Sequence, residues 1–425
     1  MAIKERVIKN LTQTENDLNL ALTTNDSLNF ENALKSLMQA KNLSQNGLTE
    51  ENYKPYAEIY DGLLLAFQNL IEVGAAQELL DLAFEFLSYL KNQIALEKSF
   101  KKELVFLPIQ AAMWDSLESV WKAAYDDTEH CIAYVIPLPY ANCNRDDSIN
   151  EWHTDRNEFP KYVPTIHFED IDLEEMHPDV IFINNPYDGV TITLTQDRFF
   201  SDKLKDYTDK LIYIPYFILA EPATKEGVRY FALTYGVLYS DQIILQSEDI
   251  KKHYIDVLVE EMPSLTREYW ENKIIAAGSP KVDKVLYSKK EDFTIPSEWL
   301  NIVKNKKVIL YLTSLKASLK NIEKVTDKLR YVFKIFKDRD DVALWWRPHP
   351  LLKNTLHYKY PEVEKEYLKL EQEYIEAGFG IYDDTGDLHR AICYSDAYYG
   401  DPSSVVTLYK YTGKPIMIQN FNICE

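Results

Sequence analysis

Glycine is scarce in this sequence, with 12 residues among 425, and cysteine is scarcer, with four. So little glycine excludes a flexible linker or tail, and a hydrophobic content of 46% is that of an ordinary globular protein. One hydrophobic core rarely serves more than about 250–300 residues. The length therefore predicts two or three domains.

The four cysteines show no CxxC spacing; they are Cys131, Cys143, Cys393 and Cys424. This pattern predicts neither a disulfide framework nor a zinc site. We therefore expect a reducing, cytoplasmic compartment.

Basic residues are outnumbered, with 47 Lys and Arg against 67 Asp and Glu and a net charge of −20. A nucleic-acid partner is disfavoured, because phosphate neutralisation needs clustered cations. Docking on an anionic bilayer through charge alone is disfavoured too, although peripheral contact with the inner face of a membrane stays open. We expect the acidic surface to serve solubility.

Long hydrophobic runs are also missing. The first residues, "MAIKERVIKNLTQTEND", lack the apolar core of a signal peptide. No later stretch approaches the roughly 20 apolar residues of a membrane span. We therefore expect no spanning segment.

The first hundred residues follow a helical period. Apolar residues at helical spacing include Phe30, Leu34, Leu37 and Met38, and later Ala76, Leu79, Leu80, Ala83, Leu87 and Leu90. Residues 1–100 are therefore predicted as an α-helical N-terminal segment. Such helices are marginal alone, so they pack on each other or on the next part of the chain. Partner docking through this segment stays open.

From about Glu103 the period changes to short apolar runs that alternate with amphipathic segments. The runs are "LVFLPI", "IAYVIPLPY", "DVIFINN", "LIYIPYFIL", "QIILQS" and "KIIAAG". This alternation predicts a mostly parallel sheet covered by helices on both faces, within residues 101–280. The stretch from Asn142 to Asp172, with Trp152 and His153, is expected as a long excursion above the sheet.

A second alternation fills residues 281–425. Its predicted strands are "KVILYLT", "VALWWR", "GFGIYDD", "DAYYGD" and "KPIMIQNF". The predicted fold class is therefore α/β, with two Rossmann-like lobes preceded by the helical segment.

Ligands of open α/β sheets bind beyond the carboxyl ends of the strands. In the second lobe one such end carries Asp401, Pro402, Ser403 and Ser404. Both serines are expected in the first turn of a helix, whose free N–H groups attract an anion, with Pro402 at the first helical position. In the alternative, Asp401 caps the helix and the serines are incidental.

The other strand ends of the second lobe also carry polar side chains. "WWRPHP" ends a strand in Arg347, with His349 two residues later, which presents a permanent cation beside a titratable ring. In "YDDTGDLH", Asp384 or Thr385 either caps the next helix or contacts a ribose or base. Ser314 follows a further strand. The acids at this edge match no metal-ligand spacing, so no metal site is predicted.

Taken together, these motifs carry a family resemblance. "GSPKVDKV", "RPHP", "DLHRAICYSDAYYGDPSSVV" and "GKPIM" resemble the C-terminal half of the bacterial CDP-glycerol glycerophosphotransferase family, the teichoic-acid polymerases with GT-B architecture. The resemblance is strong from about Ile274 to Phe421, fits in outline from about Glu103, and leaves out the helical first hundred residues.

The resemblance implies transfer of an activated group from a CDP-linked donor, bound between two Rossmann-like lobes, to a polymer, glycolipid or glycan acceptor. It implies no cofactor. Arg347, His349, Ser403 and Ser404 are expected against the donor diphosphate, with Asp401 beside them. Ser314, Asp384 and Thr385 are expected to bind the donor as well. His349 and Asp401 are the expected catalytic residues.

The first lobe departs from the family pattern. Family members carry a Trp-His-Gly-Thr-Pro segment whose His is expected to be the general base, whereas this chain has "FINNPYDGV" and "IPYFILAEPAT". Candidate bases are Asp188, Glu221, His153 and His167. A nucleotide-sugar glycosyltransferase and a non-catalytic nucleotide-binding scaffold therefore stay open as alternatives.

Overall fold

The computed structural model describes residues 2–24, 27–73, 77–143, 149–188, 194–195 and 198–419. Ala76 and Cys424 lie outside these residues. The chain packs into two compact units: Met1–Pro215 with Arg229–Ile244 and Leu258–Ile275, and Tyr216–Val228 with Leu245–Val257 and Ala276–Glu425. The domain boundaries near residues 100 and 280 stay a prediction.

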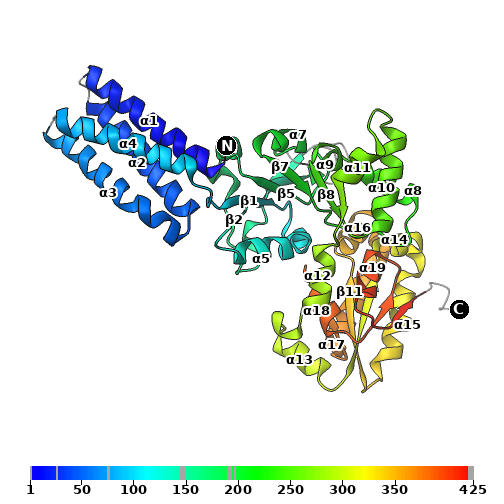
Figure 1. Cartoon of the computed structure of the whole chain (residues 1–425). Helices are drawn as coiled ribbons and strands as arrows, with labels where there is room; N and C mark the ends of the chain where they lie inside the picture. The colour runs from blue at the N-terminus through cyan, green and yellow to red at the C-terminus, as the bar shows by residue number, and fades with distance from the viewer. Residues whose placement is uncertain are drawn as a thin grey trace. The chain divides into compact units, whose positions relative to one another are not determined.

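The first unit begins with four long helices that run side by side (Figure 1). They are α1 (Ile3–Thr24), α2 (Ser27–Gly47), α3 (Glu50–Val73) and α4 (Gln77–Leu96). Every helix buries one apolar face in a shared core that includes Leu11, Leu37, Tyr60, Phe67 and Leu87. Burial of these faces stabilises helices that would be marginal in isolation.

A six-stranded sheet, called the first sheet below, comes after this bundle. Its strands stand in the order β2-β1-β5-β7-β8-β9, and β1, β2, β5, β7 and β8 run parallel to their neighbours. The strands are β1 (Lys102–Leu107), β2 (Cys131–Val135), β5 (Val180–Ile183), β7 (Lys210–Tyr213), β8 (Gln242–Leu245) and β9 (Ile274–Ala276).

Within the described ranges, seven α-helices stand along the chain between the strands of the first sheet. They are α5 (Glu118–Asp126), α6 (Leu173–Met176), α7 (Ser201–Leu204), α8 (Lys225–Ala232), α9 (Tyr235–Tyr239), α10 (Glu248–Glu261) and α11 (Arg267–Lys273). On one face of the sheet, Trp114 and Trp121 pack against Phe106 and Phe182. Each predicted apolar run of this lobe contains residues of an observed strand.

The predicted excursion differs from the structure. Part of it joins a small antiparallel sheet of β3 (Tyr140–Cys143), β4 (Ile149–His153) and β6 (Leu194–Thr195), in the order β4-β3-β6. These strands are short and mix polar with apolar residues, so they give no apolar run for a sequence pattern to detect.

The second sheet has five parallel strands in the order β12-β11-β10-β13-β14. They are β10 (Lys307–Thr313), β11 (Val342–Pro348), β12 (Gly380–Tyr382), β13 (Ala397–Gly400) and β14 (Ile416–Ile418). The associated helices are α12 (Pro280–Tyr287), α13 (Ser297–Val303), α14 (Leu315–Lys320), α15 (Val325–Lys337), α16 (Leu352–Lys359), α17 (Pro361–Ala377), α18 (Leu388–Tyr394) and α19 (Ser404–Lys410).

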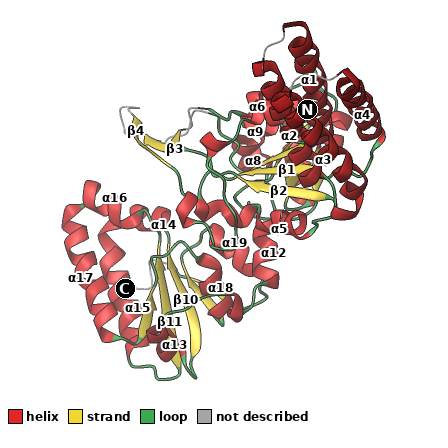
Figure 2. Ribbon diagram, turned by 90° about the vertical axis from the view of Figure 1, so that its left-hand side faces the viewer, coloured by secondary structure: helices red, strands yellow, loops and turns green. Residues whose placement is uncertain are grey.

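Helices cover both faces of the second sheet (Figure 2). Side chains alternate along a strand, so Trp346 packs with α15 and α17 on one face while Trp345 packs with α12, α18 and α19 on the other. Both tryptophans are fully buried. The predicted fold class, two Rossmann-like α/β parts preceded by a helical segment, is confirmed.

No helix in the described ranges is long and apolar enough to cross a membrane.

Candidate functional site

The strand order of the second sheet puts its reversal point between β10 and β13. From β10 the chain adds β11 and β12 on one side, then returns to add β13 and β14 on the other. Ligands of such sheets bind beyond the carboxyl ends of the strands at this point. We use the name polar edge for the last residues of β10, β11 and β13 and the residues that follow β10, β11, β12 and β13. These are residues 313–314, 347–349, 383–387 and 400–404.

Backbone hydrogen bonds join the segments of the polar edge. His349 N donates to Thr313 O at 3.0 Å, and Asp401 N donates to Leu312 O at 3.0 Å. Asp383 N donates to Trp346 O at 2.9 Å. The candidate residues expected from the sequence therefore follow neighbouring strands of one sheet.

Asp401 lies at the reversal point and is fully buried. One carboxylate oxygen pairs with the buried Lys328 ammonium of α15, and the other accepts from Ser314 N at 2.8 Å. The alternative in which Asp401 caps the following helix is wrong, because Ser403 is the N-cap of α19. Pro402 accordingly precedes the cap instead of occupying the first helical position.

Gly400 is the last residue of β13 and has φ at +150°. At this residue β13 lies close to its neighbour β10. A Cβ at this position would lie 2.3 Å from Leu312 O and 2.8 Å from Leu312 N. Only glycine fits such an approach in this left-handed conformation. The glycine thereby lets the 400–404 segment turn directly over the end of β10.

Ser403 and Ser404 have different surroundings. The Ser403 hydroxyl is buried, and the Tyr398 phenol lies close to it. The Tyr398 hydroxyl donates to Asp401 O at 2.5 Å, and burial raises the pKa of Tyr398. Ser404 is exposed and is the first residue of α19, so its hydroxyl is the one open to a ligand.

Arg347 is buried and is not an open cation. Its Nη1 pairs with Asp383 and donates to Asp387 O at 3.1 Å, and its Nη2 donates to Thr385 O at 2.6 Å. The planar guanidinium thus holds the 383–387 loop in place. The predicted direct contact between Arg347 and a diphosphate stays a prediction.

Asp383 is the buried centre of this loop, and sequence reasoning gave it no role. Trp345 Nε1 donates to it at 2.9 Å and Thr385 Oγ1 at 2.7 Å, and Arg390 pairs with it at 3.4 Å. Burial favours a higher pKa for Asp383, but Arg347, these hydrogen bonds and Arg390 hold that pKa below its usual value. A strand-end Asp with a Thr two residues later is too common a pattern to reveal this.

The expected capping by Asp384 or Thr385 is also wrong. Asp387 is the N-cap of α18 and accepts from Arg390 N at 3.0 Å. Asp384 is exposed, as is Thr385, whose hydroxyl accepts from Arg390 Nη2 at 2.8 Å. Ser314 in turn is the N-cap of α14, accepting from Ala317 N at 3.3 Å.

His349 is the histidine of the polar edge. Its Nδ1 accepts from Leu351 N at 3.2 Å, so the proton of the neutral ring sits on Nε2. Burial lowers the pKa of His349, which keeps the ring neutral at pH 7. Nε2 can therefore donate one hydrogen bond to an anionic ligand.

The four candidate bases lie in different settings. Asp188 follows β5 and accepts from Ser201 N at 2.8 Å and Ser201 Oγ at 2.9 Å. Burial raises the pKa of Asp188 to about 6, despite these two bonds. Glu221 accepts from Gln246 Nε2 and Ser247 Oγ. His153 is exposed, and His167 caps a short 3₁₀ turn.

The chain is similar to several solved structures, whereas no curated protein sequence matches it. One is the wall teichoic acid polymerase TagF, at 14% identity and a TM-score of 0.44, covering 86% of this chain and 80% of that one. Another is the UDP-GlcNAc 2-epimerase of Methanocaldococcus jannaschii in complex with UDP-GlcNAc and UDP, at 15% identity and a TM-score of 0.44, covering 74% and 83%.

A third is the UDP-GlcNAc 2-epimerase of Neisseria meningitidis bound to UDP-GlcNAc, at 11% identity and a TM-score of 0.45, covering 74% and 82%. The sequence comparison with families is more specific. Residues 257–424, which include the whole polar edge, match the family of CDP-Glycerol:Poly(glycerophosphate) glycerophosphotransferase, so the resemblance predicted from the motifs is confirmed for this part of the chain.

Proposed function

We propose that this chain is a transferase that moves a glycerophosphate-type group from a CDP-activated donor to a hydroxyl acceptor in the synthesis of a teichoic acid-like polymer. One observation carries the proposal: the segment that matches the glycerophosphotransferase family contains the complete polar edge of a doubly wound sheet. The proposal assigns no metal ion or cofactor to the site, and it places the reaction on the cytoplasmic side of a membrane.

In the proposed reaction an acceptor oxygen attacks the glycerol-bearing phosphorus of the donor. The new oxygen–phosphorus bond forms as the bond to the cytidylate breaks, and CMP leaves with the negative charge. Fixed donors at the leaving group are the effective way to stabilise such charge. His349 Nε2–H and the Ser404 hydroxyl are the two donors that the proposal assigns to this task.

The acceptor hydroxyl loses a proton, so a base is needed. Burial raises the pKa of Asp188 to about 6, which leaves most of this carboxylate ionised at pH 7 yet more basic than an ordinary aspartate. Its orientation is fixed by Ser201 through both carboxylate oxygens. On this chemistry the proposal ranks Asp188 first among the candidate bases.

The test is calorimetric titration of the full chain with CDP-glycerol, CDP, UDP and UDP-GlcNAc, followed by an assay for CMP release. We expect the cytidine compounds to bind. Ser404→Ala should weaken CDP-glycerol binding about tenfold, the equivalent of 1.4 kcal/mol for one lost charge-assisted hydrogen bond. Ser88→Ala, at an exposed serine of α4, is the matched control and should bind as the wild type does.

Three outcomes separate the alternatives. Failure of every cytidine compound to bind contradicts the proposal. Preference for UDP-GlcNAc with sugar transfer assigns a glycosyltransferase. Binding of CDP-glycerol without CMP release assigns a scaffold, which the missing Trp-His-Gly-Thr-Pro segment favours as the second candidate.

A further inference from the structure

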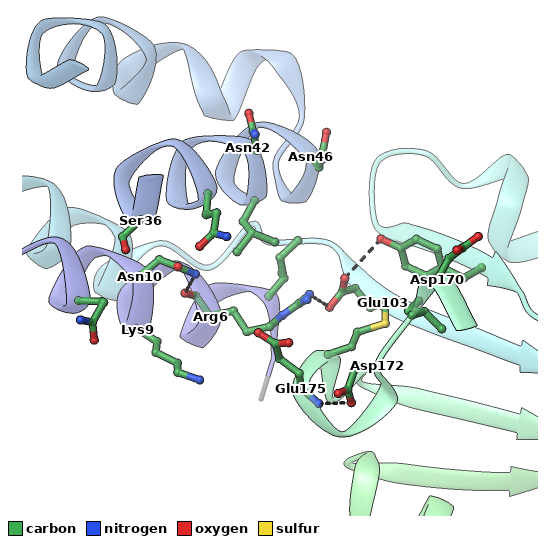
Figure 3. A pocket seen from close by; sticks show the side chains of 17 residues that line it. Arg6, Lys9, Asn10, Ser36, Asn42, Asn46, Glu103, Asp170, Asp172 and Glu175 are labelled. Atoms are coloured by element: carbon green, nitrogen blue, oxygen red, sulfur yellow. Dashed lines mark hydrogen bonds and ion pairs between the residues drawn. The ribbon is translucent and has the colours of Figure 1, made fainter. Parts of the chain in front are cut away.

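A cavity of about 580 Å³ lies in the first unit, between helices α1 and α2 and the segment 170–176 (Figure 3). This volume falls within the range of about 300–1,000 Å³ that is usual for small-molecule sites. Its lining is mostly polar: Arg6, Lys9, Asn10, Gln13, Ser36, Gln39, Asn42, Asn46, Glu103, Tyr134, Asp170, Asp172 and Glu175, together with Ile3, Leu43, Ile171 and Met176. We call it the amide groove.

An ion pair and hydrogen bonds connect the walls of the amide groove. Arg6 of α1 pairs with the buried Glu103 of β1, to which the Tyr134 hydroxyl also donates at 3.4 Å (Figure 3). Nearby, Lys101 N donates to Gly47 O at 2.8 Å at the end of α2. These bonds join the bundle to the first strand of the sheet, so the groove is preformed.

Side-chain amides dominate the two helical walls. Gln39, Asn42 and Asn46 follow one face of α2 at helical spacing, while Asn10 and Gln13 do so on α1. The three amides of α2 are exposed and make no hydrogen bond within the described part of the chain. Asparagine inside a helix costs free energy relative to alanine, and at 42 and 46 no hydrogen bond within the described part of the chain offsets this cost.

The charges of the groove select against a polyanion. The Arg6 charge is taken up by Glu103, which leaves Lys9 against Asp170, Asp172 and Glu175. Nor do these acids form a cation site, since no three His, Cys, Asp or Glu side chains converge anywhere in the described ranges. A phosphate chain would meet net repulsion, and an apolar ligand would leave the amides unpaired.

We propose that the amide groove binds an uncharged, hydroxyl-rich chain, an oligosaccharide. Each amide offers a donor and an acceptor together, and each carboxylate offers acceptors, which is the set that neighbouring sugar hydroxyls require. If the proposed function holds, this chain is the glycan part of the acceptor; that assignment rests on the proposed function, whereas binding by the groove does not.

The test measures oligosaccharide binding to the full chain without nucleotide. Chitotetraose, maltohexaose and mannopentaose are the neutral probes, and a glycerol phosphate hexamer and a heparin tetrasaccharide are the anionic ones. We expect at least one neutral probe to bind and both anionic probes to fail. Asn42→Ala/Asn46→Ala should weaken that binding at least about tenfold, because two amides lose their hydrogen bonds to the sugar.

A matched control is Asn16→Ala/Asn32→Ala, which removes two exposed helical amides that do not line the groove. Both double variants should fold, because alanine favours helix, and the control should bind the probe normally. Failure of all neutral probes, preference for an anionic probe, or equal loss in the control overturns the proposal.

Titration of the same samples with CDP-glycerol keeps the two proposals apart. The groove variant should bind this nucleotide as the wild type does. If the chain binds a sugar but no nucleotide, the proposal for the amide groove stands and the proposed function is rejected. If it binds the nucleotide but no sugar, the proposed function stands and the proposal for the groove is rejected.

Discussion

At the scale of single residues, buried ionic contacts hold the polar edge, and exposed groups are left for a ligand. Arg347 and Asp401 are buried with their charges paired inside the fold. Ser404, Thr385 and Asp384 are exposed. The candidate residues therefore divide into those that position the loops and those that can touch a substrate.

Asp401→Ala should destabilise the protein far more than loss of a helix cap would. The change removes the carboxylate that pairs with the buried Lys328 ammonium. Removing one partner of a buried ion pair lowers the free energy of unfolding by about 3–5 kcal/mol. Loss of a cap costs about 1 kcal/mol. Urea denaturation measures the difference.

Two controls accompany this measurement. Asp401→Ala combined with Lys328→Met should recover part of the lost stability, because the unpaired charge is gone. Asp384→Ala, at the exposed neighbouring loop, should change stability by less than about 0.5 kcal/mol. A cost near 1 kcal/mol for Asp401→Ala alone would contradict the ionic role.

Asp188→Asn should stabilise the protein, and more so as the pH rises. The folded-state pKa of Asp188 is raised from 3.8 to about 6 by burial. An acid whose pKa is higher in the folded state contributes to the free energy of unfolding below pH 3.8, and this contribution is lost as the pH rises through 6. Asparagine cannot ionise, so the variant should gain about 1–2 kcal/mol over the wild type by pH 7.5, allowing for partial solvent exposure.

Thermal midpoints at about pH 4 and pH 7.5 check this result. Asp206→Asn, at an exposed position of the same region, should show no such pH-dependent gain. If the thermal midpoints of the Asp188 variant and the wild type differ by the same amount at both pH values, the predicted pH-dependent gain is contradicted. A carboxylate kept at a cost to folding is the pattern expected of a functional group.

At the scale of elements, prediction from sequence succeeded where apolar periodicity is strong. The run "KVILYLT" coincides with β10, Lys307–Thr313, because a strand buried on both faces needs apolar residues throughout. The antiparallel strands β3, β4 and β6 were missed because they are short and contain no continuous apolar run.

The same scale explains the errors at the candidate site. Whether Asp384, Thr385 or Asp387 caps α18 depends on side-chain direction, which residue type does not give. The partner of Asp401 is Lys328, 73 positions away, on a helix whose register only the folded chain defines. Residue types therefore located the polar edge, but long-range packing decides which of its members are open to a ligand.

At the scale of the whole molecule, the bundle and the second sheet have separate cores. Leu37, Tyr60 and Phe67 belong to the core of the bundle, and Trp346, Phe333 and Tyr374 to one core of the second sheet. Regions with separate cores can open separately. A ligand that binds one region stabilises it without stabilising the other to the same degree.

Binding of CDP-glycerol should therefore slow amide hydrogen exchange in β10, β11 and β13 and leave the exchange of α1 to α4 unchanged. At a concentration of about 100 times the dissociation constant, the ligand adds about 2.7 kcal/mol to the stability of the region that binds it. Amides that exchange by opening of that region should then exchange roughly hundredfold more slowly. Exchange followed by mass spectrometry resolves the two regions within one sample. Ser404→Ala at the same nucleotide concentration should give a smaller effect, because its affinity is reduced. Equal slowing in the bundle would show that the two cores open together, and slowing confined to the bundle would move the nucleotide site away from the polar edge.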